Sequence, residues 1–446
     1  MNDNKMNWDR LICDKRLGLE QYTDSNNGGI RSDFQRDYDR LIFSSPFRRL
    51  QNKTQVFPLP GSIFVHNRLT HSLEVSSVGK SLAREASKRL REKYRNEEWV
   101  NKLYDIDEIV SAACLAHDLG NPPFGHSGEK AISSFFSEGE GVNLKDSLTA
   151  EEWNDLIHFE GNANSFRQLV HQFAGRRPGG FAMTYSMLAS IVKYPYSSSQ
   201  ANAKGKFGFF TSEKEVFSHI AEELGIIKLA EDKYARHPLV YLVEAADDIC
   251  YQVMDLEDAH KLKIINTRET LDLMLNFFSG QRKDQILEVM ATVADKNEKV
   301  SYLRSCIIGT LVNECAEAFV AHEEEILKGE FNGCLIDHIS PTVKEAYATC
   351  SKLAFAKIYC ASSVVEIDLA GNQIIAFLMK KLIDAVRYPE KNYSQLLLSK
   401  VPQQYEVHAP TLFGKIQAVL DHMSAMTDVY ALDLYRKLNG MSLPAV

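Results

Sequence analysis

The stretch that most restricts the fold is the segment 237–261, which reads HPLVYLVEAADDICYQVMDLEDAHK. The apolar residues after Pro238 predict one long helix, because proline is well suited to a helix start. Asp247 lies in the middle of this helix, next to alanines and close to Cys250. A buried carboxylate is costly unless it has a partner. The sequence therefore predicts a packed helical protein in which other segments bring a partner, such as a metal ion, to Asp247.

The rest of the chain predicts an all-α fold. Helix-like segments dominate after the first 70 residues, and strands do not alternate with helices as they would in a parallel sheet. One small β-hairpin is expected near residues 54–66, where prolines and a glycine separate two β-prone runs. We expect three parts, namely an N-terminal arm and helix at 1–45, a core at 46–262 and a C-terminal helical region at 263–446 packed on that core.

Composition and charge exclude some classes of protein. No apolar stretch among the 446 residues approaches the roughly 20 needed to span a membrane, and the first residues lack the apolar core of a signal peptide. We therefore expect a cytoplasmic protein without a membrane partner. The formal net charge of -8 argues against a protein that binds nucleic acid mainly by electrostatics. An anionic ligand would need local cations or a metal.

Two further segments offer metal ligands in helices. RLTHSLEV places His71 near a helix start, and LAHDLG places His117 and Asp118 at a helix end. Together with Asp247 they supply two imidazoles and two carboxylates, a set that suits Mn²⁺, Fe²⁺, Zn²⁺ or Ni²⁺ and leaves positions for water and phosphate oxygens. Taken singly, His71 could be a cap and Asp247 could pair with a lysine. The ordered combination is far more specific.

The segment LAHDLGNPPFGHSGEK (115–130) continues beyond this pair. His126 and Glu129 are three residues apart, so they share one face if a helix starts after the prolines. The carboxylate could then orient the imidazole and keep it protonated. The alternative is that His126 simply caps this helix.

The order H…HD…D resembles the signature of the HD superfamily of metal-dependent phosphohydrolases. Longer stretches are similar to one branch, the bacterial deoxyguanosine triphosphate triphosphohydrolases (dGTPases), and extend the resemblance over most of the chain. These stretches include RSDFQRDYDRLIFSSPFRRLQNKTQVF (31–57), HNRLTHSLEV (66–75), AHDLGNPPFGHSGE (116–129), HFEGNANSFR (158–167), VKYPYS (192–197), EAADDICYQVMDLED (244–258) and MTDVYALDLYRKLNG near the C-terminus.

The resemblance implies the helical HD-domain fold and an enzyme of nucleotide metabolism. Its reaction would be the metal-dependent hydrolysis of a deoxynucleoside triphosphate, with dGTP expected first, to deoxynucleoside and inorganic triphosphate. It also implies a divalent cofactor (Mn, Mg, Fe, Ni or Zn, with Mn or Mg expected in an assay), a homo-oligomer such as a hexamer, and an effector that is single-stranded DNA or a nucleotide. The alternatives are an HD-type nucleotidase or phosphodiesterase acting on another nucleotide, and a nucleotide- or DNA-responsive binding protein with secondary hydrolysis. Base preference stays open.

Catalytic roles follow from the same resemblance. Water would attack the α-phosphorus, and the departing 5′-oxygen would need a proton. The resemblance implies that His126, oriented by Glu129, supplies that proton. Glu160 in HFEGNAN matches a further acidic position near the family's active site. A buried structural carboxylate is the alternative for Glu160.

The substrate's charge and sugar need further partners. Arg68 shares a helix face with His71, and the resemblance implies phosphate contacts for Lys193 and Tyr194. Weaker candidates are Lys53 and the pair Arg48–Arg49. Asn162 is a further candidate for substrate binding. On the long helix, Asp247, Tyr251 and Asp255 are spaced four residues apart, which predicts that they form one stripe. The resemblance assigns Tyr251 and Asp255 to the sugar, together with Gln55, and places Val56 near the base.

Overall fold

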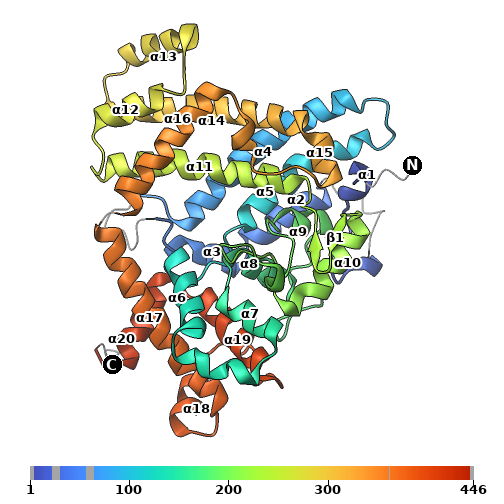
Figure 1. Ribbon diagram of the computed structural model, residues 1–446, viewed down its shortest axis with the longest axis vertical. Coiled ribbons are helices and arrows are strands. Elements are labelled where there is room, and N and C mark those ends of the chain that lie inside the picture. Colours follow the sequence, from blue (N-terminus) through green and yellow to red (C-terminus); the bar gives the residue numbers. More distant parts are fainter. Residues whose placement is uncertain (1–4, 23–30, 57–64, 361, 442–446) are drawn as a thin grey trace.

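The computed structural model describes residues 5–22, 31–56, 65–360 and 362–441, and it confirms the all-α prediction (Figure 1). Within these ranges the two named strands are β1 (Lys228–Ala230) and β2 (Lys233–Tyr234), which form a small antiparallel pair that the sequence did not predict. The expected hairpin near residues 54–66 falls largely on residues 57–64, outside the described residues. Thr54 and Asn67, which lie on either side of those residues in the sequence, form an isolated antiparallel bridge.

The helices divide into two groups along the chain. The first group consists of α1 (Trp8–Leu11), α2 (Asp33–Ile42), α3 (Ser45–Arg49), α4 (Arg68–Lys93), α5 (Ile106–Ala116), α6 (Gly125–Ser137), α7 (Ala150–Ile157), α8 (Gly161–Val170), α9 (Tyr185–Ser190), α10 (Lys214–Leu224) and α11 (Leu239–Lys261). The second group consists of α12 (Thr267–Leu275), α13 (Gly280–Thr292), α14 (Lys296–Ala321), α15 (Glu323–Lys328), α16 (Pro341–Leu353), α17 (Ser362–Arg387), α18 (Asn392–Leu398), α19 (Leu412–Ala425) and α20 (Asp428–Leu438). None of the helices in the described residues is long and apolar enough to cross a membrane.

The helices that carry the predicted ligands begin and end as the sequence suggests. Asn67 caps α4, because its side chain accepts a hydrogen bond from the backbone of Thr70. The long helix α11 follows Pro238, as predicted. Helix α5 ends at Ala116, one residue before the His–Asp pair. The two histidines and Asp247 are thus placed by one helix start, one helix end and one helix middle.

The buried apolar side chains form two separate clusters. The larger one surrounds α4, α5, α11 and α14, and the smaller one fills the space between α6, α17 and α19. Figure 1 shows α11 and α14 on one side of the molecule and α17 to α20 on the other. Leu119 belongs to the larger cluster and Phe124 to the smaller one. The connection between α5 and α6 therefore crosses from one hydrophobic core to the other.

A buried ion-pair cluster joins the same two regions. Arg167 on α8 donates two hydrogen bonds to Asp421 on α19, at 2.9 and 2.8 Å, and a third to Glu213 at 2.5 Å. All three side chains are almost fully excluded from solvent. Burial raises the pKa of Glu213, although the guanidinium opposes this shift. The two carboxylates therefore depend on Arg167 for their charge balance.

Replacing Arg167 with methionine should lower the free energy of unfolding by about 3–5 kcal/mol, because it leaves two buried carboxylates without a cation. The urea midpoint of unfolding, followed by circular dichroism, measures this loss. Arg268→Met is the control, since Arg268 is largely exposed and lies 3.9 Å from Asp272; such a surface pair contributes at most about 1 kcal/mol. An unchanged midpoint for Arg167→Met would contradict a stabilising role.

Candidate active site

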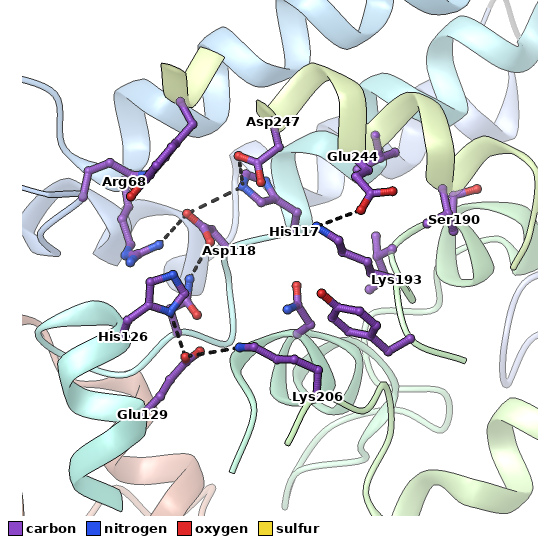
Figure 2. Close-up of a pocket in the computed structure, with 18 residues that line it drawn as sticks. Arg68, His117, Asp118, His126, Glu129, Ser190, Lys193, Lys206, Glu244 and Asp247 are labelled. Carbon is purple, nitrogen blue, oxygen red and sulfur yellow. Dashed lines mark hydrogen bonds and ion pairs between the residues drawn. The ribbon is translucent and has the colours of Figure 1, made fainter. Parts of the chain in front are cut away.

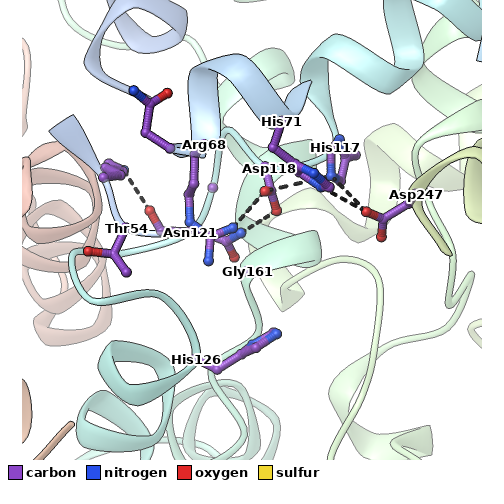
Figure 3. A network of polar contacts seen from close by, with 12 residues as sticks. Thr54, Arg68, His71, His117, Asp118, Asn121, His126, Gly161 and Asp247 are labelled. Atoms are coloured by element: carbon purple, nitrogen blue, oxygen red, sulfur yellow. Dashed lines mark hydrogen bonds and ion pairs between the residues drawn. The ribbon is translucent and has the colours of Figure 1, made fainter. Parts of the chain in front are cut away.

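Three of the predicted metal ligands converge on one point. His71 Nε2 lies 3.0 Å from Asp247 Oδ1, and His117 Nε2 lies 3.6 Å from the same oxygen. The ligand atoms of His71, His117 and Asp247 all lie within 4.8 Å of one another, which is a spacing that a single ion can bridge. Figure 3 shows the three side chains arriving from different elements. This donor set could hold a divalent cation.

The tautomer of His117 suits a ligand. Its Nδ1 lies 2.6 Å from the carbonyl oxygen of Cys114, so Nδ1 carries a proton and donates it, which leaves Nε2 facing the cluster. Burial lowers the pKa of His117, but the carboxylates of Asp118 and Asp247 outweigh it and raise that pKa to about 9. The negative potential that retains a proton here would equally favour a metal ion.

Asp118, the fourth predicted ligand, lies at the edge of this group. Its Oδ2 is 3.6 Å from His117 Nε2 and accepts a hydrogen bond of 2.6 Å from Arg68. Asn121 donates to its other oxygen. Burial raises the pKa of Asp118, yet Arg68 and the two histidines reverse that effect and lower it to about 2. Asp118 is therefore a carboxylate that Arg68 shares with the cation site.

His126 and Glu129 form the predicted pair. His126 Nδ1 lies 2.8 Å from Glu129 Oε2, and this hydrogen bond raises the pKa of the imidazole. Glu129 is buried, and its other oxygen accepts a hydrogen bond of 2.9 Å from the backbone N–H of Gly161. The capping alternative is wrong, because the N-cap residue of α6 is Phe124 and His126 lies inside the helix.

The close approach of Gly161 explains why this position needs glycine. A Cβ atom there would lie 2.0 Å from Asn121 Oδ1 and 2.3 Å from Glu129 Oε1. Any side chain would therefore push apart the two residues that contact Asp118 and His126. Gly161, the first residue of α8, thus packs directly against Asn121 and Glu129 and limits the movement of both side chains.

Most of these groups line one cavity of about 210 Å³, shown in Figure 2, whereas His71 lies behind its lining. His117, Asp118 and Asp247 lie on one side of it, and His126 and Glu129 lie on another. Further predicted residues that line it are Gln55, Arg68, Asn162, Lys193, Tyr194 and Tyr251. Gln55 Oε1 is buried and has no hydrogen-bond partner among the described residues. The cavity therefore combines a cation site, a histidine with a raised pKa and several cations.

Tyr251 has a fixed orientation in this cavity. Its ring stacks on Tyr359 with a centroid separation of 5.8 Å and meets the edge of His71 at 6.5 Å. Asp255, one turn further along α11, is not among the lining residues. Its carboxylate accepts a hydrogen bond of 2.5 Å from Tyr359, and burial raises its pKa to about 7. Val56 packs against the larger hydrophobic cluster and does not line the cavity either.

Glu160 lies beside the cavity and forms an ion pair with Lys206. It is the N-cap residue of α8, and its side chain bonds Asn162 at 2.6 Å and Lys206 at 2.5 Å. Lys206 itself lines the cavity and lies 3.9 Å from Glu129. Glu160 borders a second hollow that also contains His126 and Glu129. It therefore contacts the neighbours of the His126–Glu129 pair rather than the group of His71, His117 and Asp247.

Asn121, Lys206 and Glu244 line the cavity, but the sequence analysis did not predict them. Asn121 contacts Asp118, Lys206 contacts Glu160, and Glu244 bridges Lys193 at 3.1 Å and Arg236 at 2.9 Å. A signal for Glu244 existed, since it precedes Asp247 by three residues on one helix. Lys206 lies in a polar loop, and nothing local in the sequence marks it.

The all-helical fold and this arrangement of histidines and aspartates identify the protein as a hydrolase of the HD-domain class. Residues 68–178 match the HD domain family, and residues 338–437 match the family described as a phosphohydrolase-associated domain. These two ranges contain α4 to α8 and most of α16 to α20, respectively. The chain belongs to the deoxyguanosinetriphosphate triphosphohydrolase-like family within that class.

Similar proteins align over nearly their full length. A deoxyguanosinetriphosphate triphosphohydrolase-like protein of Pseudomonas aeruginosa is 36% identical over 99% of this chain and 100% of its own. A protein of the same description from Synechocystis is 35% identical over 98% of this chain and 100% of its own. The deoxyguanosinetriphosphate triphosphohydrolase of Yersinia enterocolitica is 29% identical over 91% of this chain and 93% of its own.

Proposed function

We propose that this protein hydrolyses a deoxynucleoside triphosphate, with dGTP as the first expected substrate, to the deoxynucleoside and inorganic triphosphate. The observation that carries the proposal is the single cavity that joins the cation site to the His126–Glu129 pair. The names of the relatives support dGTP as the nucleotide. A cytoplasmic homo-oligomer that responds to single-stranded DNA or a nucleotide remains part of this proposal, which light scattering and effector titrations can test.

The chain's own residues fit this reaction. A divalent ion held by His71, His117 and Asp247 would supply Lewis-acid activation of water and of a phosphoryl oxygen. The cations Lys193 and Lys206 would balance the charge of the polyphosphate.

The leaving group determines the role of His126. Water adds its oxygen to the α-phosphorus while the bond from that phosphorus to the 5′-oxygen breaks. The departing oxygen takes a proton from His126 Nε2, since Nδ1 is held by Glu129 at 2.8 Å. Before the transfer, Glu129 stabilises the charged imidazole and fixes its orientation. After the transfer His126 is neutral; the proton that the attacking water loses passes to solvent, and solvent protonates His126 again.

Product analysis tests this function. The protein is incubated with each of the four dNTPs in the presence of Mn²⁺ or Mg²⁺, with and without single-stranded DNA, and phosphorus NMR identifies the products. Inorganic triphosphate and deoxynucleoside support the proposal. Pyrophosphate with a nucleoside monophosphate would refute it, and turnover of other nucleotides alone would favour another HD-type nucleotidase. Binding of single-stranded DNA without hydrolysis of any dNTP would favour a binding protein.

Tyr251 should exclude ribonucleotides, because its ring is fixed between Tyr359 and His71 and leaves no freedom to accommodate a 2′-hydroxyl. Replacing Tyr251 with alanine should raise kcat/KM for GTP relative to dGTP by about tenfold or more. Steady-state kinetics on both nucleotides measure the ratio. Tyr241→Phe is the control on the same helix, since the Tyr241 hydroxyl donates to the Phe331 carbonyl away from the cavity. An unchanged ratio in Tyr251→Ala would contradict this role.

A further inference from the structure

We propose that Asp428, the first residue of α20, is a positioning residue that fixes the loop carrying His126 and so sets the rate of leaving-group protonation. Asp428 lies in the region that matches the phosphohydrolase-associated domain, far along the chain from the predicted catalytic residues. The catalytic part of this inference rests on the proposed function, whereas the structural part does not.

The carboxylate of Asp428 connects two segments that border the cavity. It is completely buried. Its Oδ1 accepts a hydrogen bond of 2.9 Å from the backbone N–H of Phe124, two residues before His126. Its Oδ2 accepts bonds of 2.8 and 2.5 Å from the backbone N–H and the hydroxyl of Thr54, which precedes Gln55. One side chain thus fixes the backbone just before His126, the proposed acid, and just before Gln55, which lines the cavity.

The conformation of Phe124 requires such support. Its φ angle is 63°, in the left-handed region that is unfavourable for a residue with a side chain. Gly125 follows with φ 57°, and a Cβ there would lie 2.6 Å from Arg68 Nη2. These two residues turn the chain into α6 and so determine the direction in which the His126 side chain projects from that helix. The bond to Asp428 compensates part of this strain.

Lys53 holds the other end of the same loop. Its Nζ donates 2.6 and 2.5 Å hydrogen bonds to the carbonyls of Asn121 and Ser424. Lys53 is only 3% exposed, and burial lowers its pKa to about 7, which the negative charge of Asp428 partly opposes. It does not line the cavity, so it cannot serve as the phosphate ligand that the sequence suggested. Lys53 and Asp428 together place buried charges at both ends of the segment 121–124.

The carboxylate is not needed by its own helix. Thr427 caps α20, since its hydroxyl accepts a hydrogen bond from the backbone of Tyr430. All three hydrogen bonds of the Asp428 side chain therefore go to Thr54 and Phe124. A residue that served only to start α20 would have no reason to reach these two segments.

The test is a double-mutant cycle with dGTP as substrate and product formation as readout. Asp428→Ala should lower kcat by about 10- to 100-fold, because a displacement near 1 Å can cost that much. In a His126→Ala background, the same substitution should cost less than about threefold, since the group it positions is already absent. Asp433→Ala is the matched control, because Asp433 lies on the same helix and pairs with Lys437 on the surface; its kcat should equal that of the wild type.

Hydrogen–deuterium exchange supplies a readout that needs no activity. Peptides covering residues 119–128 should exchange faster in Asp428→Ala than in the wild type, while the binding of Mn²⁺ should be unchanged. Equal losses of kcat in both backgrounds would overturn the positioning role, as would unchanged exchange in the loop. If the wild type hydrolyses no dNTP, the proposed function fails, and the exchange experiment still decides whether Asp428 holds the loop.

Discussion

Replacing Asp247 with asparagine should abolish cation binding and hydrolysis together. Asp247 Oδ1 is the atom that both His71 and His117 approach, at 3.0 and 3.6 Å. Asparagine keeps the shape but removes the negative charge. Because such a ligand contributes several kcal/mol, we expect Mn²⁺ affinity and kcat/KM to fall by about 10³-fold or more.

Calorimetric titration of metal-stripped protein with Mn²⁺ measures the first loss, and release of triphosphate measures the second. Asp272→Asn is the control, because Asp272 is mostly exposed on α12 and 3.9 Å from its partner Arg268. If Asp247→Asn bound Mn²⁺ as tightly as the wild type, the cation site would lie elsewhere.

Replacing His126 with alanine should lower kcat by about 10²- to 10⁴-fold, the usual contribution of a general acid. Mn²⁺ affinity should stay unchanged, because His126 lies outside the group of His71, His117 and Asp247. The loss should be much smaller on a p-nitrophenyl phosphodiester, since its leaving group departs without a proton. Parallel assays with dGTP and bis(p-nitrophenyl) phosphate measure the difference.

The matched control for His126 is His322→Ala. His322 Nδ1 lies 3.2 Å from Glu325 at the same i, i+3 spacing, but it lies outside the cavity lining. Its kcat should match that of the wild type. Equal losses on both substrates for His126→Ala would show that His126 binds the phosphate instead of protonating the leaving group.

The sequence predicted that His71, His117 and Asp247 come together because each lies at a position that local rules define. A capped helix start places His71, a helix end places His117, and the middle of a long helix places Asp247, whose side chain is 33% exposed rather than buried as the sequence suggested. In each case a short stretch of residues determines the backbone around the side chain. The all-α class followed for the same reason.

Helical spacing predicted that Asp247, Tyr251 and Asp255 form one stripe on α11, but Asp255 does not line the cavity with the other two. Each step of four residues turns the helix about 40° beyond a full turn, so Asp255 points about 80° away from Asp247. Tyr251 remains in the cavity, whereas Asp255 faces Tyr359. Glu244, three residues before Asp247, is turned about 60° in the same direction, but it lies nearer the start of α11 and lines the cavity.

Contacts between distant segments were beyond prediction. Lys53 and Lys206 are ordinary lysines in the sequence, and only packing reveals that one is buried and that the other reaches Glu160. Asp428 contacts Thr54 across 374 residues. No spacing rule connects residues so far apart, because their proximity depends on how the two hydrophobic cores dock.

The crossing of the α5–α6 connection between two hydrophobic cores has a consequence for how the protein matures. Every proposed metal ligand has been synthesised once the chain reaches Asp247, but the anchor for Phe124 arrives only with Asp428. A chain that ends before α19 would contain every proposed metal ligand but would lack the anchor of Phe124, together with the α19 side chains of the smaller core and Asp421, the partner of Arg167. The geometry of the α5–α6 connection therefore depends on the last part of the chain to be synthesised.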